Sequence, residues 1–66
     1  MWFEQFIGDF YDTAADKLQH EAGKRGLTIN LIFDNYHNIK YEEAEDHTKL
    51  NVFIDFITYK IYRIEE

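Results

Sequence analysis

Acidic side chains are the residues of this sequence whose type and spacing could do chemistry. The chain of 66 residues carries thirteen Asp and Glu against seven Lys and Arg, a formal net charge of -6. The acids gather in two groups, which are Asp9, Asp12 and Asp16, and then Glu42, Glu43, Glu45 and Asp46. A surface of this charge repels phosphate backbones and anionic lipid and attracts basic surfaces. The charge therefore predicts a protein partner with a basic surface.

The first acidic group has the spacing of a helical face. Steps of three and four residues place the carboxylates of Asp9, Asp12 and Asp16 on one side, with Cβ atoms about 5 to 6 Å apart. Adjacent phosphates of a DNA strand have a comparable spacing, so these acids are suited to the DNA-binding groove of an enzyme. Tyr36 and Tyr41 would add short-range contacts, because a tyrosine has a large apolar face and a polar tip. The alternative is that the acids only keep an aromatic-rich domain soluble.

In size and charge the chain resembles the small acidic phage inhibitors that mimic DNA and block nucleic-acid enzymes of the host. The resemblance implies a viral, non-enzymatic inhibitor that acts on a larger protein. It covers size and charge only, so no residue of this sequence takes a role from it.

Catalytic and cofactor motifs are absent from the sequence. The chain has neither cysteine nor serine, and its threonines are internal, which argues against an acyl-transfer nucleophile. Its three glycines are too scattered for a phosphate-binding loop. The three histidines fall on different predicted elements, and His47 beside Asp46 is a weak metal ligand candidate. We expect no enzymatic activity, no cofactor and no direct binding of nucleic acid.

Membrane and export signals are absent as well. No apolar run approaches the ~20 residues of a membrane span, and the first ten residues contain acids but neither Lys nor Arg, unlike a signal peptide. The lack of cysteine is compatible with a reducing compartment. We expect a cytoplasmic protein with no membrane contact.

The first half of the chain changes its hydrophobic period once. Apolar residues recur at steps of three and four over residues 2–22 and predict a helix, which Gly23 or Gly26 would close. Alternation over residues 27–33 then predicts a half-buried strand. Residues 34–38 favour a hairpin connection, and residues 39–44 a second, more polar strand.

The last segment, residues 49–64, switches faces near residues 55–57. It also fits helical spacing, but its β-branched and aromatic residues favour a strand with a bulge at the switch. A strand of this length would extend about 50 Å, more than its neighbour could pair with. Its second half, residues 57–64, is therefore expected either to bend back or to pair with a second copy.

These elements predict one α+β domain over residues 1–66. An N-terminal helix packs on a three-stranded antiparallel meander (αβββ) with a long bent last strand. The candidate self-association residues are Ile57, Tyr59, Ile61 and Tyr62. A homodimer would stabilise so small a domain, because folding alone buries only about 60% of the surface that the unfolded chain exposes. The alternative function is therefore a self-associating structural or assembly module.

Overall fold

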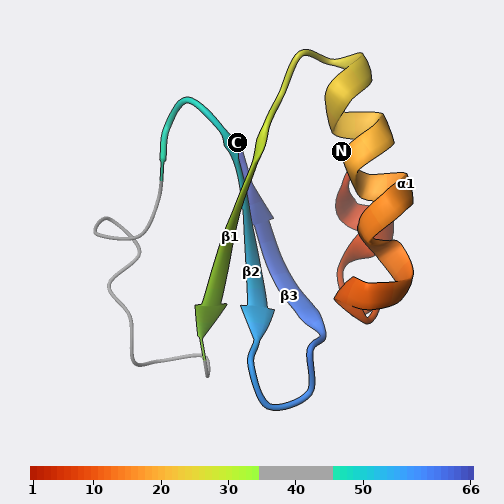
Figure 1. Cartoon of the computed structure of the whole chain (residues 1–66), viewed down its shortest axis with the longest axis vertical. Helices are drawn as coiled ribbons and strands as arrows, with labels where there is room; N and C mark the ends of the chain where they lie inside the picture. The colour runs from red at the N-terminus through yellow and green to blue at the C-terminus, as the bar shows by residue number, and fades with distance from the viewer. Residues whose placement is uncertain (35–45) are drawn as a thin grey trace.

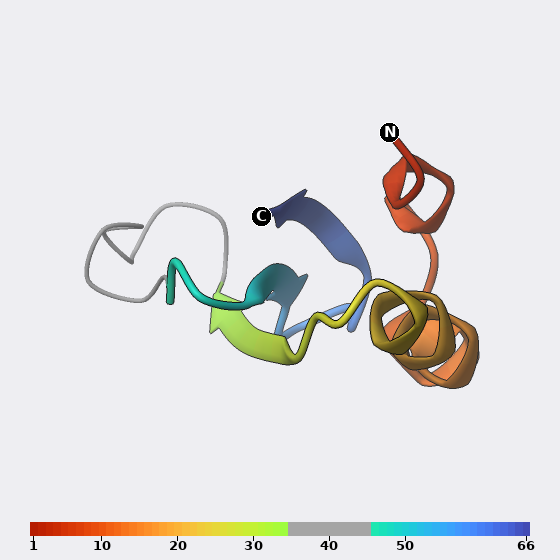
Figure 2. The same ribbon diagram turned by 90° about the horizontal axis from the view of Figure 1, so that it is seen from above.

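The computed structural model describes residues 1–34 and 46–66. The elements in chain order are η1 (Glu4–Phe6), α1 (Tyr11–Lys24), β1 (Ile29–Asp34), β2 (Leu50–Asp55) and β3 (Ile61–Glu65). The strands form one sheet in the order β1-β2-β3 (Figure 1). Both α1 and the short 3-10 helix η1 lie on one side of the sheet (Figure 2). The α+β class with one N-terminal helix is confirmed.

The sheet is mixed, so the prediction of a purely antiparallel meander is wrong. β1 and β2 run parallel, in a register from Ile29 opposite Leu50 to Asp34 opposite Asp55, and only β2 and β3 are antiparallel. Parallel neighbours need a crossover connection, because a tight hairpin cannot return the chain to the same end of the sheet. The predicted strand at residues 39–44 lies outside the described residues.

The last segment is a hairpin. β2 ends at Asp55 and β3 returns antiparallel to it, so the prediction of one long last strand is wrong. Of the two outcomes expected for its second half, bending back is the one that the structure shows. The residues at which the pattern switches faces form the turn. There, Asp55 Oδ1 accepts the N–H of Ile57 at 2.8 Å, and Asp55 O accepts the N–H of Tyr59 at 2.7 Å. A register shift does occur, but it lies earlier, between Phe53 and Ile54.

The predicted helix over residues 2–22 is interrupted before Tyr11. Gly8 adopts a φ of 95°, which residues with a Cβ rarely adopt. The interruption brings this loop against the start of β3, where Gly8 N–H donates to Ile61 O at 2.7 Å and Ile61 N–H donates to Asp9 O at 2.9 Å. A tertiary contact therefore overrides the helical pattern.

The C-terminus of α1 follows the sequence prediction. Gly26 has a φ of 72°, its N–H donates to Gly23 O, and the N–H of Leu27 donates to Ala22 O at 2.9 Å. These two bonds form a Schellman motif, which satisfies carbonyl groups that the helix end leaves free.

The core lies between α1, η1 and one face of the sheet. Its buried members are Phe3, Phe6, Ala14, Leu18, Ala22, Leu50, Val52, Ile54, Ile61 and Ile64. Every residue of β2 is buried, and β2 is the central strand of the sheet.

Candidate partner-binding surface

Two of the three acids in the first group lie on α1. Asp12 and Asp16 are exposed and one helical turn apart, as predicted. Asp9 is also exposed, but it precedes the helix, in the loop whose backbone pairs with β3. The structure thus places two of these carboxylates, and not all three, on one helical face.

Asp12 and Asp16 lie on a flank of α1 away from its buried residues Ala14, Leu18 and Ala22. Gln19 continues this stripe at the next helical step, and it lines a shallow depression of about 340 Å³ with Leu27, Thr28 and Ile29 at the start of β1. The opposite flank faces η1, where Arg25 lies over the ring of Trp2 at 4.2 Å.

The two flanks differ in how their acids are paired. Glu21 accepts hydrogen bonds from Lys24 Nζ and Arg25 Nη1, each at 3.2 Å. These contacts, with Lys24 the larger influence, hold the pKa of Glu21 below its usual value. The carboxylates of Asp12 and Asp16 make no ion pair with any residue in 1–34 or 46–66. Their charge is not neutralised by a described neighbour.

Asp46 is the described member of the second acidic group. Its Oδ1 accepts the hydroxyl of Thr48 at 2.6 Å and the N–H of Thr48 at 3.0 Å, while Lys49 Nζ lies 3.7 Å from Oδ2. The Thr48 hydroxyl is the main reason that the pKa of Asp46 is lowered. The rest of the predicted binding residues lie outside the described ranges: Tyr36, Tyr41, Glu42, Glu43 and Glu45.

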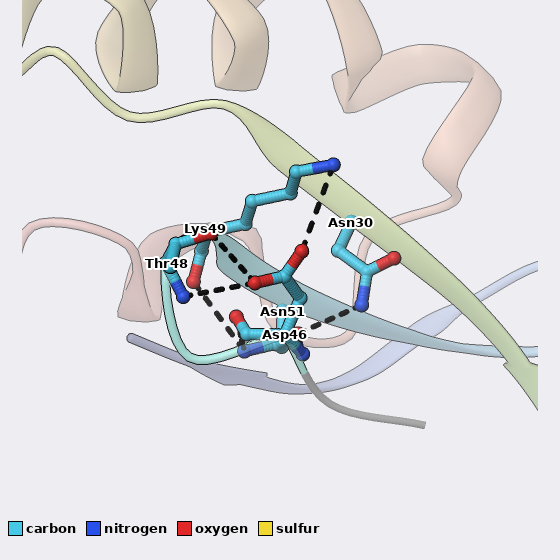
Figure 3. Close-up of polar contacts among 5 residues, drawn as sticks. All are labelled: Asn30, Asp46, Thr48, Lys49 and Asn51. Carbon is cyan, nitrogen blue, oxygen red and sulfur yellow. Dashed lines mark hydrogen bonds and ion pairs between the residues drawn. The ribbon is translucent and has the colours of Figure 1, made fainter. Parts of the chain in front are cut away.

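The buried side-chain amide of Asn51 joins Asp46 to the sheet. The Oδ1 of Asn51 accepts Asn30 Nδ2 and the backbone N–H of Asp46, each at 2.9 Å, and its Nδ2 donates to Asp46 O at 3.1 Å (Figure 3). Asn51 is 1% exposed, so these bonds satisfy a polar group that water does not reach. The network fixes where the chain enters β2.

The four predicted self-association residues separate into two kinds. Ile57 and Tyr59 are 72% and 50% exposed and lie in the β2–β3 turn. Ile61 is fully buried in the core, and the hydroxyl of Tyr62 donates to Asp34 Oδ2 at 2.9 Å. Only Ile57 and Tyr59 present large apolar surface to a second molecule.

Exposed apolar side chains on β1 were not predicted as a binding site. Leu31 and Phe33 share the core-facing side of the sheet with Val52 and Ile54, yet they are 37% and 48% exposed. They lie on an edge strand, at the margin of the area that α1 covers. The alternation of residues 27–33 indicated the correct face, but no local signal shows that a strand lies at an edge.

Two buried carboxylates end the parallel strands. Asp34 and Asp55 are register partners, 3% and 4% exposed. Asp55 organises the β2–β3 turn through the N–H groups of Ile57 and Thr58, and Asp34 accepts the hydroxyl of Tyr62. These hydrogen bonds give each buried carboxylate a structural role. In the sequence, both are acidic residues at the end of a stretch rich in apolar residues, and this is the signal that could have indicated them.

Residues 1–34 and 46–66 hold no group of three His, Asp or Glu side chains arranged to bind a metal ion. In the same part of the chain, no helix has the length and apolar character that crossing a bilayer requires.

Comparison of the chain with protein-family models, with curated proteins and with solved structures finds no match.

Proposed function

We propose that the protein is a non-enzymatic inhibitor or regulator that occupies a basic, nucleic-acid-binding surface of a larger cytoplasmic protein. The observation that carries the proposal is the exposure of Asp9, Asp12 and Asp16 without a cationic partner among the described residues. Acids that already have partners, such as Glu21, gain less from a new cation.

The proposed mechanism is electrostatic competition. Carboxylates one helical turn apart on a rigid helix approach the spacing of phosphates along a strand. The Lys and Arg side chains that hold a phosphate backbone would then be attracted by Asp12 and Asp16. Because the acids are exposed, salt screens the attraction, with a Debye length of about 8 Å at physiological ionic strength.

The test compares two double variants with equal charge changes. Asp12→Asn with Asp16→Asn removes the unpaired acids of α1. Glu4→Gln with Glu66→Gln removes as much charge beside the separate depression of about 570 Å³ that both glutamates line between η1 and the end of β3. Immobilised wild-type and variant proteins capture nucleic-acid-binding proteins from cell lysate, and a short DNA duplex displaces them.

We expect the α1 variant to lose at least about tenfold in affinity for the captured protein, a difference of ~1.4 kcal/mol. The control variant should keep the wild-type affinity at matched ionic strength. Equal losses in both variants, or capture that DNA does not displace, would contradict the proposal.

A self-associating module is the second candidate, favoured by the exposure of Ile57 in the β2–β3 turn. Sedimentation of the wild type and of Ile57→Glu distinguishes the two functions. A dimer that the substitution dissociates supports the module, whereas a wild-type monomer at all accessible concentrations excludes it.

A further inference from the structure

We propose that the end of the molecule around the β2–β3 turn binds an amphipathic helix of a partner protein, and that Lys or Arg side chains flank the apolar face of this helix. The helix would belong to the basic surface that the proposed function assigns to the partner, so this inference deepens that function. It rests on the function for the role of Asp9 and Asp12, whereas its apolar contacts are independent of that role.

Exposed apolar side chains from three segments gather at this end. Figure 1 shows the end of β1, the β2–β3 turn and the start of α1 at the lower end of the view. Two backbone hydrogen bonds join them: Phe56 N–H donates to Asp34 O at 3.1 Å, and Tyr11 N–H donates to Tyr59 O at 2.8 Å. The exposed side chains, which we call the turn patch, are Phe10, Phe33, Phe56, Ile57 and Tyr59. Apolar side chains exposed in a group, unlike single ones, indicate a binding surface.

The members of the turn patch are neighbours in space. The ring of Phe33 meets the ring of Tyr59 edge-on, with centroids 6.3 Å apart. Phe10 forms an antiparallel bridge with Lys60, the residue after Tyr59, and Lys60 Nζ lies 5.2 Å from the centre of the Phe10 ring. A molecule that covers Tyr59 would therefore also bury apolar surface of Phe10 and Phe33, which folding leaves partly in water.

Tyr59 supports a binding role because its backbone is strained. Its φ is 62°, in the left-handed region that glycine adopts readily and an aromatic residue does not. Strained residues of this kind are concentrated at ligand-binding sites. The ring is half-exposed, so packing within the chain buries only part of it. A partner that covers the ring would bury the remainder.

The backbone of the turn favours a helix as the occupant. The N–H groups of Ile57 and Thr58 donate to Asp55 Oδ1 at 2.8 Å and 3.4 Å. Tyr59 N–H donates to Asp55 O at 2.7 Å, and Lys60 N–H donates to Thr58 Oγ1 at 3.3 Å. A partner strand would need these N–H groups, which already donate within the chain. A helix satisfies its own backbone and presents side chains alone, so its apolar face can lie on the turn patch.

Charge decides what kind of helix fits. Asp9 and Asp12 are exposed and lie one and two residues from Phe10, and neither carboxylate forms an ion pair within residues 1–34 and 46–66. Ile61 N–H donates to Asp9 O at 2.9 Å, which holds this loop against the start of β3. A second copy of the chain, with a net charge of -6, would bring a second pair of these acids. Lys or Arg beside the apolar face of a partner helix would instead attract them.

The experiment uses a synthetic probe peptide of about 14 residues, with Leu at helical spacing on one face and Lys on the others. Titration into the whole protein is followed by calorimetry and by NMR shifts of the backbone amides. We expect the amides of Phe10, Ile57 and Tyr59 to shift and that of Trp2, beside η1, to stay unchanged. The controls are a peptide of the same composition in scrambled order and a peptide with Glu in place of Lys. Each control should bind at least about tenfold more weakly.

Matched substitutions locate the site on the protein. Ile57→Ser removes an exposed isoleucine of the turn patch, and Ile7→Ser removes an exposed isoleucine that lines the separate depression between η1 and the end of β3. Tyr59→Gly removes the ring and relieves the positive φ, so this variant should stay folded. We expect Ile57→Ser and Tyr59→Gly each to weaken binding of the probe at least about tenfold, and Ile7→Ser to keep the wild-type affinity. Tyr59→Gly keeps the test valid if Ile57→Ser unfolds the protein.

The outcomes separate this inference from the proposed function. If the scrambled peptide binds as well as the patterned one, or if Ile7→Ser weakens the probe and the two turn variants do not, the turn site is wrong. The proposed function then still stands if Asp12→Asn with Asp16→Asn abolishes the capture that DNA displaces. If the turn variants weaken the probe and the two Asn substitutions leave that capture unchanged, the turn site stands and the proposed function fails. A wild-type dimer that Ile57→Ser dissociates, or binding of the wild type to phosphatidylcholine vesicles, would assign the turn patch to another occupant and overturn the inference.

Discussion

The two edges of the sheet are treated differently by the same chain. At β3, Gly8 and Asp9 bond to Ile61, and Tyr11 N–H donates to Tyr59 O at 2.8 Å, so the protein's own N-terminal loop closes the start of that edge. At β1, no described segment closes the outer side. Proteins usually protect edges with charge, proline or a covering segment. The comparison teaches that backbone bonds from a distant loop cover the start of one edge, whereas no segment within residues 1–34 and 46–66 does so at the other.

The composition of the two edge strands agrees with this difference. β3 carries Arg63 and Glu65, which form an ion pair, whereas β1 contains no Lys, Arg or Pro and bears a single charge at its end, Asp34. Charged side chains on an edge strand discourage pairing with another chain, and β1 has none before its last residue.

The largest effect is expected from a substitution in the core beneath the β3 edge. Ile61→Ala removes a fully buried side chain at the residue whose backbone the N-terminal loop binds. We expect a loss of about 2 to 5 kcal/mol in the free energy of unfolding, measured by urea denaturation, with faster hydrogen exchange at Gly8. Ile57→Ala in the same hairpin should change stability by less than ~0.5 kcal/mol. Equal effects would mean that Ile61 is not the anchor.

The next effect concerns the hydrogen bonds by which Asn51 of β2 joins Asn30 of β1 and Asp46. Asn51→Leu removes a buried acceptor and leaves the N–H of the half-buried Asp46 and the Nδ2 of Asn30 without it. We expect a loss of about 1 to 3 kcal/mol by urea denaturation. Thr48→Ala, which removes only the exposed hydroxyl contact to Asp46, should cost less. A neutral Asn51→Leu variant would refute a stabilising role for the network.

Two alanine substitutions test whether backbone conformation closes the β3 edge. No atom lies within 4 Å of a Cβ added at Gly8 or Gly23, so sterics are equal, but only Gly8 has a positive φ, 95°. We expect Gly8→Ala to destabilise by about 1 to 2 kcal/mol and Gly23→Ala to stabilise by about 0.5 to 1 kcal/mol, because alanine favours a helix interior. Thermal denaturation measures both. The same sign for both variants would contradict the argument.

The smallest expected effect is a pH dependence of stability that comes from the paired acid of α1, Glu21. The pKa of Glu21 is lowered by its contacts with Lys24 and Arg25. A depressed folded-state pKa contributes stability that is present above the unfolded value, near 4.5, and is lost as pH falls through the folded value. Because Glu21 is on the surface, the change is slight. Urea denaturation of the wild type and of Glu21→Gln should converge as pH falls below 4.5, and a constant difference would exclude the linkage.

Several features followed from the sequence because their causes are local. Gly26 ends α1 because glycine adopts the left-handed conformation of a Schellman motif. Asp12 and Asp16 share a helical face because their spacing is one turn. The last segment was expected either to bend back or to pair with a second copy, because its length exceeds that of a usual strand, and it bends back after Asp55.

Other features depend on contacts between residues distant in the chain. The helical pattern of residues 2–22 breaks at Gly8 because the loop there pairs with Ile61, a partner that local periodicity cannot reveal. The parallel pairing of β1 with β2 joins strands separated by a long connection, and an alternating pattern looks the same in either direction.

The candidate surface shows the same division. The sequence by itself determined the negative charge and the solvent exposure of Asp12 and Asp16, since unpaired carboxylates remain in water. Only the tertiary structure decided that Leu31 and Phe33 lie on an edge strand of the described sheet and stay partly exposed. Strand order and edge position arise from long-range pairing, which no short stretch of sequence encodes.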